Sequence, residues 1–317
     1  MFPAAGDDPE QDLALRDLPA FRAGEGHASG SHELRTTGPG DAGQLGDGDP
    51  GGCISTARTL RPEEGAMTTT LGLIGAGMIG TTVAHLAVAA GLDVVLSNTR
   101  GPDTLADLVT NLGEHAHAGT PADAARDGDL VVVAIPLNGY RLLPAAALAG
   151  KTVIDAMNYY PQRDGRIPEL DANGLTSSQL VQQHLADSRV VKAFNSITYI
   201  SLGNRARPAG EPDRSALPIA GDDTAAKAQV AALLDTLGYD AVDIGTLADS
   251  WRSEPNTPVY VQPYFAGEAP KGLDPEEEFR WHLTNHGVPV PADQIRKLTN
   301  TAVRGKAGGY LPGLETA

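Results

Sequence analysis

The sequence predicts an α/β protein whose main domain is a doubly wound, mostly parallel β-sheet. Between positions 71 and 244, short apolar runs alternate with amphipathic segments of about 10 to 15 residues, as in strands joined by crossover helices. A glycine-rich turn follows the first apolar run, where sheets of this kind often open their first crossover. The composition changes on both sides of this stretch and predicts a different organisation there.

The first 66 residues are predicted to be a disordered extension. They contain 12 glycines, no lysine, 12 acidic residues and 5 arginines, a net charge of −7 out of −16 for the whole chain. Glycine and proline recur too often for a helix or strand to propagate, apart from a short amphipathic segment at 12–21. Met67 directly precedes the first apolar run, so we expect that the working protein can start there.

Six apolar runs are predicted to form the sheet. The run 130–135 is continuous and ends at Pro136, which is typical of a parallel strand covered on both faces. The predicted strands are 71–74, 94–96, 130–135, 152–156, 189–195 and 240–244.

Helical spacing of apolar residues predicts helices at 81–90, 103–112 and 224–237. Gly91 and Gly238 stand directly after the first and last of these, where a C-cap glycine belongs. After residue 245 prolines recur, and helical patterns remain only at 275–286 and 292–303. We therefore predict a small C-terminal cap of loops and helices over 246–317.

Composition excludes several classes of protein. The 40 acidic against 24 basic residues argue against a nucleic-acid-binding surface, and no run approaches the roughly 18 apolar residues of a membrane span. Cys53 is the only cysteine, which excludes a disulfide framework and a cysteine-built metal site. We expect a cytoplasmic protein with small-molecule partners, and a homo-oligomer stays open.

The turn Gly75-Ala76-Gly77-Met78-Ile79-Gly80 is a complete GxGxxG motif between a predicted strand and a predicted helix. Gly75 permits the tight turn, Gly77 leaves room for a pyrophosphate, and Gly80 lets the helix pack close to the sheet. Backbone N–H groups at the helix start favour phosphate. The motif predicts a dinucleotide-binding Rossmann domain over 67–245.

The end of the second predicted strand indicates which dinucleotide is bound. An NAD enzyme usually has Asp or Glu there, whereas this chain has Ser97, Asn98 and Arg100. Arginine gives fork-like charged hydrogen bonds to phosphate oxygens, and a carboxylate would repel them. We therefore predict that these three residues bind the 2′-phosphate of NADP(H).

Several segments together resemble the F420-dependent NADP oxidoreductase family. They are 73–80, Leu96-Ser97-Asn98 with Arg100, Ala134-Ile135-Pro136, 156–161, the Lys-Ala-Phe run 192–194, Gly221-Asp222-Asp223 with Lys227, Leu237-Gly238-Tyr239, and 243–247. The resemblance covers about residues 71–250. It implies a Rossmann fold, NADP(H) as cofactor, and hydride transfer between NADPH and coenzyme F420.

The resemblance also implies roles for individual residues. Ala76, Gly77, Met78 and Ile79 would line the pyrophosphate, Ile135 would pack on the nicotinamide ribose side, and Asn158 and Ala193 would line the nicotinamide pocket. Two features depart from the family pattern. The pair Tyr159-Tyr160 is inserted into the usual Asn-Pro step, and the tail after Trp251 is richer in proline.

Hydride transfer between two ring cofactors needs stacking and exclusion of water, so we expect no catalytic side chain and no metal. If Ala193 faces the cofactor, Lys192 faces away, because alternate strand residues point to opposite faces. We expect the pair His282 and His286, and the pair His115 and His117, to be solvated. Aromatic residues that offer a flat surface are Tyr159, Tyr160, Phe194, Trp251 and Tyr264.

Two other functions stay open at this point. One is an NADPH-dependent reductase of a small imine or carbonyl substrate, with Tyr159 or Tyr160 as proton donor. The other is a non-catalytic sensor that binds NADPH without turning it over.

Overall fold

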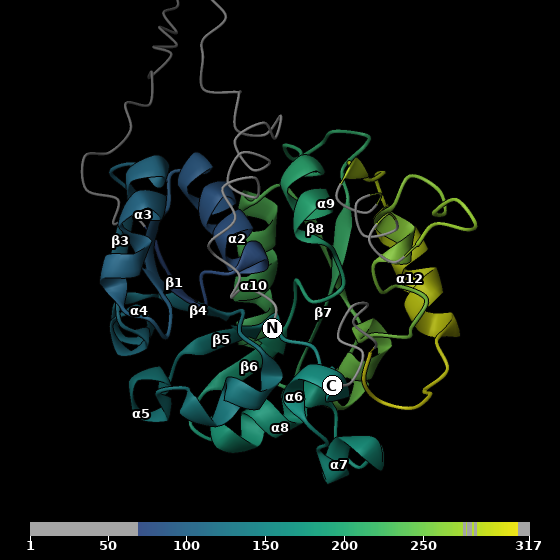
Figure 1. Cartoon of the computed structure of the whole chain (residues 1–317), viewed down its shortest axis with the longest axis horizontal. Helices are drawn as coiled ribbons and strands as arrows, with labels where there is room; N and C mark the ends of the chain where they lie inside the picture. The colour runs from purple at the N-terminus through teal and green to yellow at the C-terminus, as the bar shows by residue number, and fades with distance from the viewer. Residues whose placement is uncertain (1–68, 275–276, 278–280, 282–283, 310–317) are drawn as a thin grey trace, which may run out of the picture. The chain divides into compact units, whose positions relative to one another are not determined.

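The structure is a computed structural model that describes residues 69–274, 277, 281 and 284–309 (Figure 1). The predictions for residues 1–66 and for His282 lie outside the described residues, as does most of the predicted helix 275–286. The domain boundary predicted at residue 245 stays a prediction.

Eight strands form one sheet in the order β3-β2-β1-β4-β5-β6-β7-β8. All neighbouring strands are parallel except β6 and β7, so the predicted doubly wound, mostly parallel fold is confirmed. The strands are β1 Thr70–Ile74, β2 Asp93–Ser97, β3 Ala116–Gly119, β4 Leu130–Val133, β5 Thr152–Asp155, β6 Arg189–Lys192, β7 Ala216–Gly221 and β8 Asp240–Asp243.

Strands β3 and β7 are not among the predicted strands, and Pro218 within β7 argues against an inner strand. The pairing explains why proline fits. Strand β7 pairs with β8 over four residues but with β6 only at Ala220 and Gly221, so at Pro218 the sheet continues on one side only.

Helices cover both faces of the sheet (Figure 1). One face carries α2, α3, α9, α10 and α12, and the other carries α4, α5 and α8. The α-helices are α2 Met78–Ala89, α3 Ala106–Leu112, α4 Pro121–Asp127, α5 Ala145–Leu148, α6 Pro161–Asp164, α7 Pro168–Asp171, α8 Ser177–His184, α9 Tyr199–Asn204, α10 Thr224–Thr236 and α12 Ala292–Thr301. The 3-10 helices are η2 Pro102–Leu105, η3 Leu137–Leu142, η4 Leu247–Ser253 and η5 Gln262–Tyr264.

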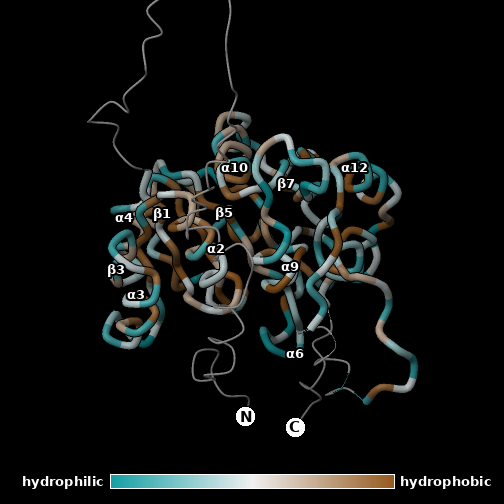
Figure 2. Tube along the Cα trace, turned by 90° about the horizontal axis from the view of Figure 1, so that it is seen from above, coloured by the Kyte–Doolittle hydropathy of each residue, from teal (hydrophilic) through white to brown (hydrophobic). Residues whose placement is uncertain are grey.

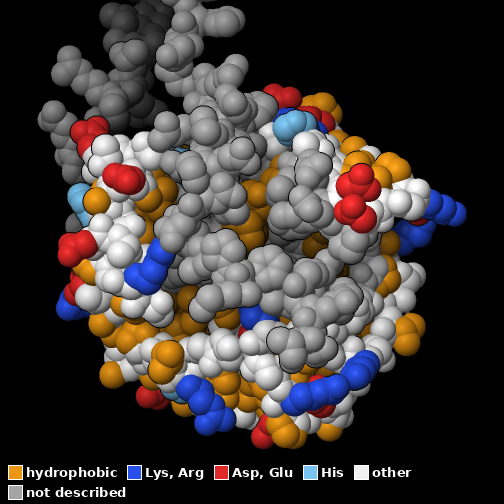
Figure 3. All heavy atoms as spheres, in the orientation of Figure 1, with side chains coloured by type: hydrophobic (Ala, Val, Ile, Leu, Met, Phe, Trp, Pro, Cys, Tyr) orange, Lys and Arg blue, Asp and Glu red, His pale blue; other side chains and the backbone are white. Residues whose placement is uncertain are grey.

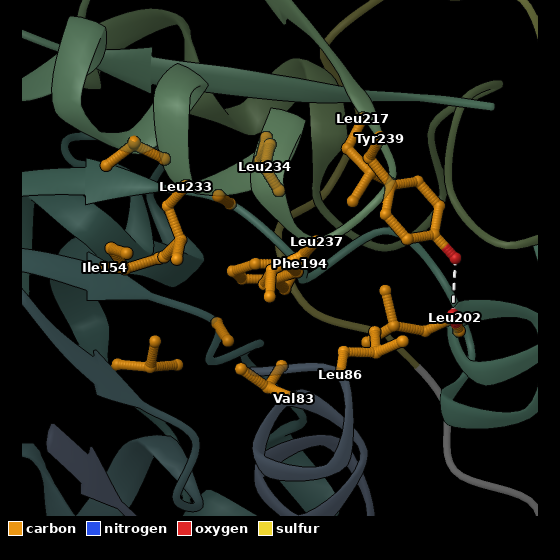
Figure 4. Close-up of a cluster of buried hydrophobic side chains, with 14 of the residues drawn as sticks. Val83, Leu86, Ile154, Phe194, Leu202, Leu217, Leu233, Leu234, Leu237 and Tyr239 are labelled. Atoms are coloured by element: carbon orange, nitrogen blue, oxygen red, sulfur yellow. Dashed lines mark hydrogen bonds between the residues drawn. The ribbon is translucent and has the colours of Figure 1, made fainter. Parts of the chain in front are cut away.

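The strands divide their side chains between two hydrophobic clusters. In β1, Leu71 and Leu73 face the α2 side, whereas Ile74 faces the α4 side, as the two-residue period of a strand requires. Figure 4 shows the α2-side cluster, where Tyr239, directly before β8, also donates its hydroxyl to the Leu202 carbonyl of α9. In Figure 2 the hydrophobic colour follows the inner strands, whereas α6 is hydrophilic.

Both predicted C-cap glycines are confirmed. Gly91 has φ +80° and donates to the Val88 carbonyl, while Leu92 donates to Ala87, which is the Schellman arrangement. Gly238, with φ +94°, and Tyr239 repeat the arrangement at the end of α10. No helix among the described residues is long and apolar enough to cross a bilayer.

Candidate functional site

The predicted site residues lie along one edge of the sheet. Strands β1, β2, β4, β5 and β6 are mutually parallel, so the loops that follow them meet at their carboxyl ends. The chain passes outward from β1 to β2 and β3 and then returns to β4 on the other side of β1. Open α/β sheets bind ligands at such a switch point.

The three motif glycines have three different environments. Gly75 has φ +109° and donates its N–H to the Ser97 carbonyl at 3.0 Å, and a Cβ there would stand 2.8 Å from Cγ2 of Ile135. A Cβ on Gly80 would overlap the carbonyl oxygen of Gly75. A Cβ on Gly77 would meet no described atom within 4 Å. Two glycines are therefore required for packing, whereas Gly77 borders open space.

The open space lies at the start of α2. Gly77 is the N-cap residue and provides no side-chain hydrogen bond to the first turn. Met78, which follows it, is 40% exposed. Unpaired N–H groups of a first turn and the positive end of the helix dipole attract an anion. This turn therefore has the chemistry that a pyrophosphate needs.

Ser97 and Asn98 are both occupied by local hydrogen bonds. Ser97 is fully buried and donates its hydroxyl to the Leu73 carbonyl at 2.9 Å. The Oδ1 atom of Asn98 accepts from the backbone N–H groups of Arg100 and Gly101, each at 2.9 Å. Asn98 thus shapes the turn that presents Arg100, which is exposed. The role of Ser97 in 2′-phosphate binding stays a prediction, since its side chain faces the strands.

Ile135 follows β4 and is half-buried beside the glycine turn. Its side chain lies between Gly75 and Gly139, since a Cβ on either glycine would press against it, at 2.8 and 3.2 Å. The small size of both glycines leaves room for this side chain above the turn. Ile135 is therefore an apolar wall directly next to the open N-terminus of α2.

At the ends of β5 and β6, two asparagines bind each other. The Nδ2 of Asn158 donates to the backbone carbonyl of Asn195 at 2.8 Å, and the Nδ2 of Asn195 donates to Oδ1 of Asn158 at 3.2 Å. Asn195 also donates to the carbonyl of Ser253 in η4 at 2.7 Å. Sequence reasoning selected Asn158 but gave no role to Asn195 or Ser253.

Ala193 and Phe194, which connect β6 to Asn195, are buried in the α2-side core. Ala193 has no exposed surface. It would therefore line a nicotinamide pocket, as predicted, only through its backbone atoms or after a conformational change. Phe194 has φ +62°, a left-handed conformation that a bulky residue adopts only when its surroundings enforce it. This strained turn brings Asn195 to Asn158.

Lys192 is the centre of a buried charged cluster. Its Nζ donates to Oδ2 of Asp155 at 3.2 Å, to Oγ of Ser177 at 3.0 Å, and to the Met157 carbonyl. Ser177 in turn donates to Glu254 at 2.7 Å. Lys192 and Asp155 have no exposed side-chain surface. The prediction that Lys192 faces away from a cofactor stays a prediction.

Tyr159 and Tyr160 are both buried and hydrogen-bonded. The Tyr159 hydroxyl donates to Asp171 at 3.1 Å and accepts from the Ile167 N–H at 2.9 Å. The Tyr160 hydroxyl is bonded to that of Tyr260. Burial raises the pKa of both Tyr159 and Tyr160. The Tyr159 proton is therefore used within the protein, whereas either hydroxyl of the Tyr160–Tyr260 pair can be the donor.

The C-terminal segment packs tightly on this tyrosine pair. Gly309 donates its N–H to the Tyr159 carbonyl at 2.9 Å. A Cβ on Gly309 would stand 2.6 Å from the Tyr160 ring, and one on Gly308 would stand 2.7 Å from Pro161. The tyrosine loop is therefore covered by residues from the far end of the described chain.

The remaining candidates lie away from the asparagine pair or make structural contacts. Arg252 lies over the Trp251 ring at 4.7 Å and donates to the Thr299 carbonyl, and buried Tyr264 donates to the Ala216 carbonyl. His286 is exposed.

Within the described ranges, no three His, Cys, Asp or Glu side chains are grouped to hold a metal ion. On the face drawn in Figure 3, the Lys and Arg side chains that are coloured stand in separate groups.

Comparison with protein families gives a match over the first half of the sheet. Residues 70–159 match the family described as NADP oxidoreductase, coenzyme F420-dependent. The matched segment contains the glycine turn, Asn98, Arg100, Ile135 and Asn158. It ends before β6 and therefore does not include Asn195.

Among curated proteins, Metalloreductase STEAP3 from Rattus norvegicus is 29% identical over 186 residues, which are 58% of this chain and 35% of that protein. Putative protein YjhV from Escherichia coli K12 is 42% identical over 53 residues, which are 17% of this chain and 39% of that protein. The chain thus spans little more than a third of the length of these relatives.

Two solved structures are 28% identical to the chain. The hypothetical protein SMa0349 from Sinorhizobium meliloti matches with a TM-score of 0.54 over 61% of this chain and 93% of its own. A candidate F420-dependent NADP reductase from Arthrobacter sp. FB24 matches with a TM-score of 0.50 over 58% of this chain and 87% of its own. The shared part is accordingly most of each of those proteins.

Proposed function

We propose that the chain, whose residues 70–159 match the family of coenzyme F420-dependent NADP oxidoreductases, transfers a hydride between NADPH and coenzyme F420. The family match and the 28%-identical solved structure support an NADP-dependent oxidoreductase. The observation that carries the proposal is the open space beside Gly77. In the sequence this residue lies between Gly75 and Gly80, which the packing requires to be glycines.

The nucleotide half of the proposal assigns the turn Gly75–Gly80 to the pyrophosphate. Backbone N–H groups bind the phosphate oxygens there, and Gly77 allows the close approach. Arg100, presented by the Asn98 turn, binds the 2′-phosphate with a charged hydrogen bond. Ile135 packs on the ribose next to the nicotinamide ring, which reaches Asn158 at the end of β5.

The second half of the proposal concerns the hydride acceptor. NADPH and a deazaflavin together supply the hydride chemistry, so the protein must align two rings and exclude water. The residues assigned to the ring, Ile135 and Asn158, have no ionisable side chain, and the nearby ammonium of Lys192 is held by Asp155. This composition favours direct ring-to-ring transfer over a reaction that needs a proton from the protein.

The test uses the full chain with NADPH and oxidised F420. We expect NADPH to bleach the deazaflavin absorbance, and NADH to do so far more slowly. A Gly77→Ala variant is the matched control, because the added methyl meets no described atom within 4 Å in the free protein and acts only on the bound pyrophosphate. Binding of NADPH without any bleaching would contradict the F420 assignment.

The same samples distinguish the two other functions. A reductase of a small imine or carbonyl substrate would oxidise NADPH with such substrates and would lose turnover in a Tyr159→Phe or Tyr160→Phe variant. A sensor would bind NADPH and oxidise none with any acceptor. The donation of the Tyr159 hydroxyl to Asp171 argues against Tyr159 as the proton donor and so favours the F420 reaction.

A further inference from the structure

We propose that Asn195 is a positioning residue, which fixes the direction of the Asn158 carboxamide at the nicotinamide end of the site. The inference rests on the proposed function, since it assumes that Asn158 meets the nicotinamide. It adds a residue outside the matched family segment, held by a contact with η4 that joins two distant parts of the chain.

The two asparagines are joined by a pair of hydrogen bonds of opposite direction. Asn158 gives one N–H to the backbone carbonyl of Asn195 at 2.8 Å and receives one N–H from the Asn195 side chain at 3.2 Å. Rotating the Asn158 amide by 180° would place its NH₂ against the Asn195 NH₂ and its oxygen against a carbonyl oxygen. Two favourable contacts would become two repulsive ones, so one orientation is selected.

Asn195 itself is fixed by contacts from η4. Its second N–H goes to the Ser253 carbonyl at 2.7 Å, and its Oδ1 accepts from the Ser253 hydroxyl at 3.3 Å. Both donors of Asn195 are therefore used within the protein, and the residue is only 3% exposed. Asn195 therefore has no N–H left for a ligand, and it acts on a ligand only through Asn158.

Asn158 retains one N–H and further acceptor capacity on its oxygen, and it is half-buried rather than enclosed. A primary carboxamide, such as that of nicotinamide, offers one acceptor oxygen and an NH₂ donor. An asparagine held in one direction pairs with that group in one sense only. Asn195 therefore sets the direction in which the ring's carboxamide is recognised.

The experiment is a double-mutant cycle in the full chain, with Asn195→Asp, Asn158→Ala and the combination. Aspartate keeps the shape of Asn195 but at neutral pH offers no donor to Asn158 or Ser253. We expect Asn195→Asp to lower kcat/KM for NADPH roughly 10-fold in the otherwise unchanged protein. In the Asn158→Ala background the same change should have less than a twofold effect, because its target is gone.

A merely structural role gives a different pattern. Equal losses in both backgrounds, or no loss in either, would overturn the proposal. Asn204→Asp is the matched control: Asn204 is also a buried asparagine, 2% exposed, with its Nδ2 on the Ile200 carbonyl. It should lower thermal stability without changing kcat/KM. If Asn195→Asp does not fold, Asn195→Ser enters the same cycle with the same expectation.

NADPH binding by the unsubstituted protein separates this inference from the proposed function. If that protein neither binds NADPH nor bleaches F420, the proposed function fails and this inference fails with it. If it does both and the cycle shows no coupling, the positioning role of Asn195 alone is wrong.

Discussion

The two ends of the candidate site are built in opposite ways. At β1 the chain offers backbone: the turn Gly75–Gly80 contributes N–H groups, and open space borders Gly77. At β5 and β6 the chain offers side chains, and Asn158, Asn195 and Lys192 are each held by several hydrogen bonds. The first end is local in sequence, whereas the second joins residues 37 and 58 positions apart.

The difference separates two kinds of constraint. A turn that binds through its backbone depends on small residues at certain positions. Larger side chains there act by occupying space and do not change any charge. A network of buried polar side chains depends on every partner, so the loss of one leaves others unsatisfied. We therefore expect substitutions at the asparagine end to lower stability. At the glycine end we expect a loss of binding at Gly77, which borders open space, and a loss of stability at Gly80, which is packed.

The largest expected effect is at the buried lysine. Lys192→Met should destabilise the fold by about 3–5 kcal/mol, because it leaves Asp155 buried without its cation. Chemical denaturation would measure the loss. The control is Arg126→Ala, which breaks an ion pair with Asp123 whose side chains are 62% and 37% exposed, so a far smaller loss of stability is expected. Equal losses would contradict the greater contribution of the buried ion pair at the asparagine end.

The next effect concerns the cofactor. Arg100→Ala should raise the dissociation constant of NADPH about 10- to 100-fold, since a charge-assisted hydrogen bond contributes about 1.5–3 kcal/mol. The dissociation constant of NADH should hardly change, because NADH lacks the 2′-phosphate. Calorimetric titration with both nucleotides measures the ratio, and equal weakening would remove Arg100 from the proposed phosphate site.

The glycine turn gives a matched pair of variants. Gly80→Ala should cost about 1–3 kcal/mol of stability, because the added methyl overlaps the Gly75 carbonyl. Gly77→Ala should leave the free protein close to its original stability, as its methyl meets no described atom, yet weaken NADPH binding. Thermal melts with and without NADPH test both. A stability loss of similar size in Gly77→Ala would show that the space is not open.

The smallest effect comes from an exposed carboxylate outside both ends. Hydrogen bonds from the side chain and backbone of Thr120 lower the pKa of Asp123 from 3.8 to about 2. The folded state thus favours the ionised form of Asp123. The resulting contribution to the free energy of unfolding is fully present above pH 3.8 and is lost as the pH falls towards 2. An NMR titration should place its midpoint near 2, and Asp123→Asn should flatten the acid limb of stability. A midpoint near 3.8 would contradict the capping contact.

Sequence reasoning succeeded where the information is local. The start of β1, the glycine turn and the C-cap glycines Gly91 and Gly238 all follow from neighbouring residues, and the structure contains each of them. It missed α8, although the capping box of Thr176 and Gln179 is a local signal for the start of this helix. It also missed β7, where Pro218 is tolerated only because of how the neighbouring strands pair.

The rest of the candidate site was beyond reach for a physical reason. The contact of Asn195 with Ser253 depends on η4 returning from β8 and packing against α8 and β6, and no sequence period reports such a contact. The left-handed turn at Phe194 is equally invisible, because the residue type argues against it.

The packing of Gly308 and Gly309 on the tyrosine loop has a consequence for biosynthesis. A ribosome releases the strands of the nucleotide half long before it adds these two glycines. The surfaces of Tyr159 and Tyr160 that these glycines cover therefore stay bare until almost all of the remaining described chain is made. A nascent chain halted before residue 308 would expose that aromatic surface to chaperones and to aggregation.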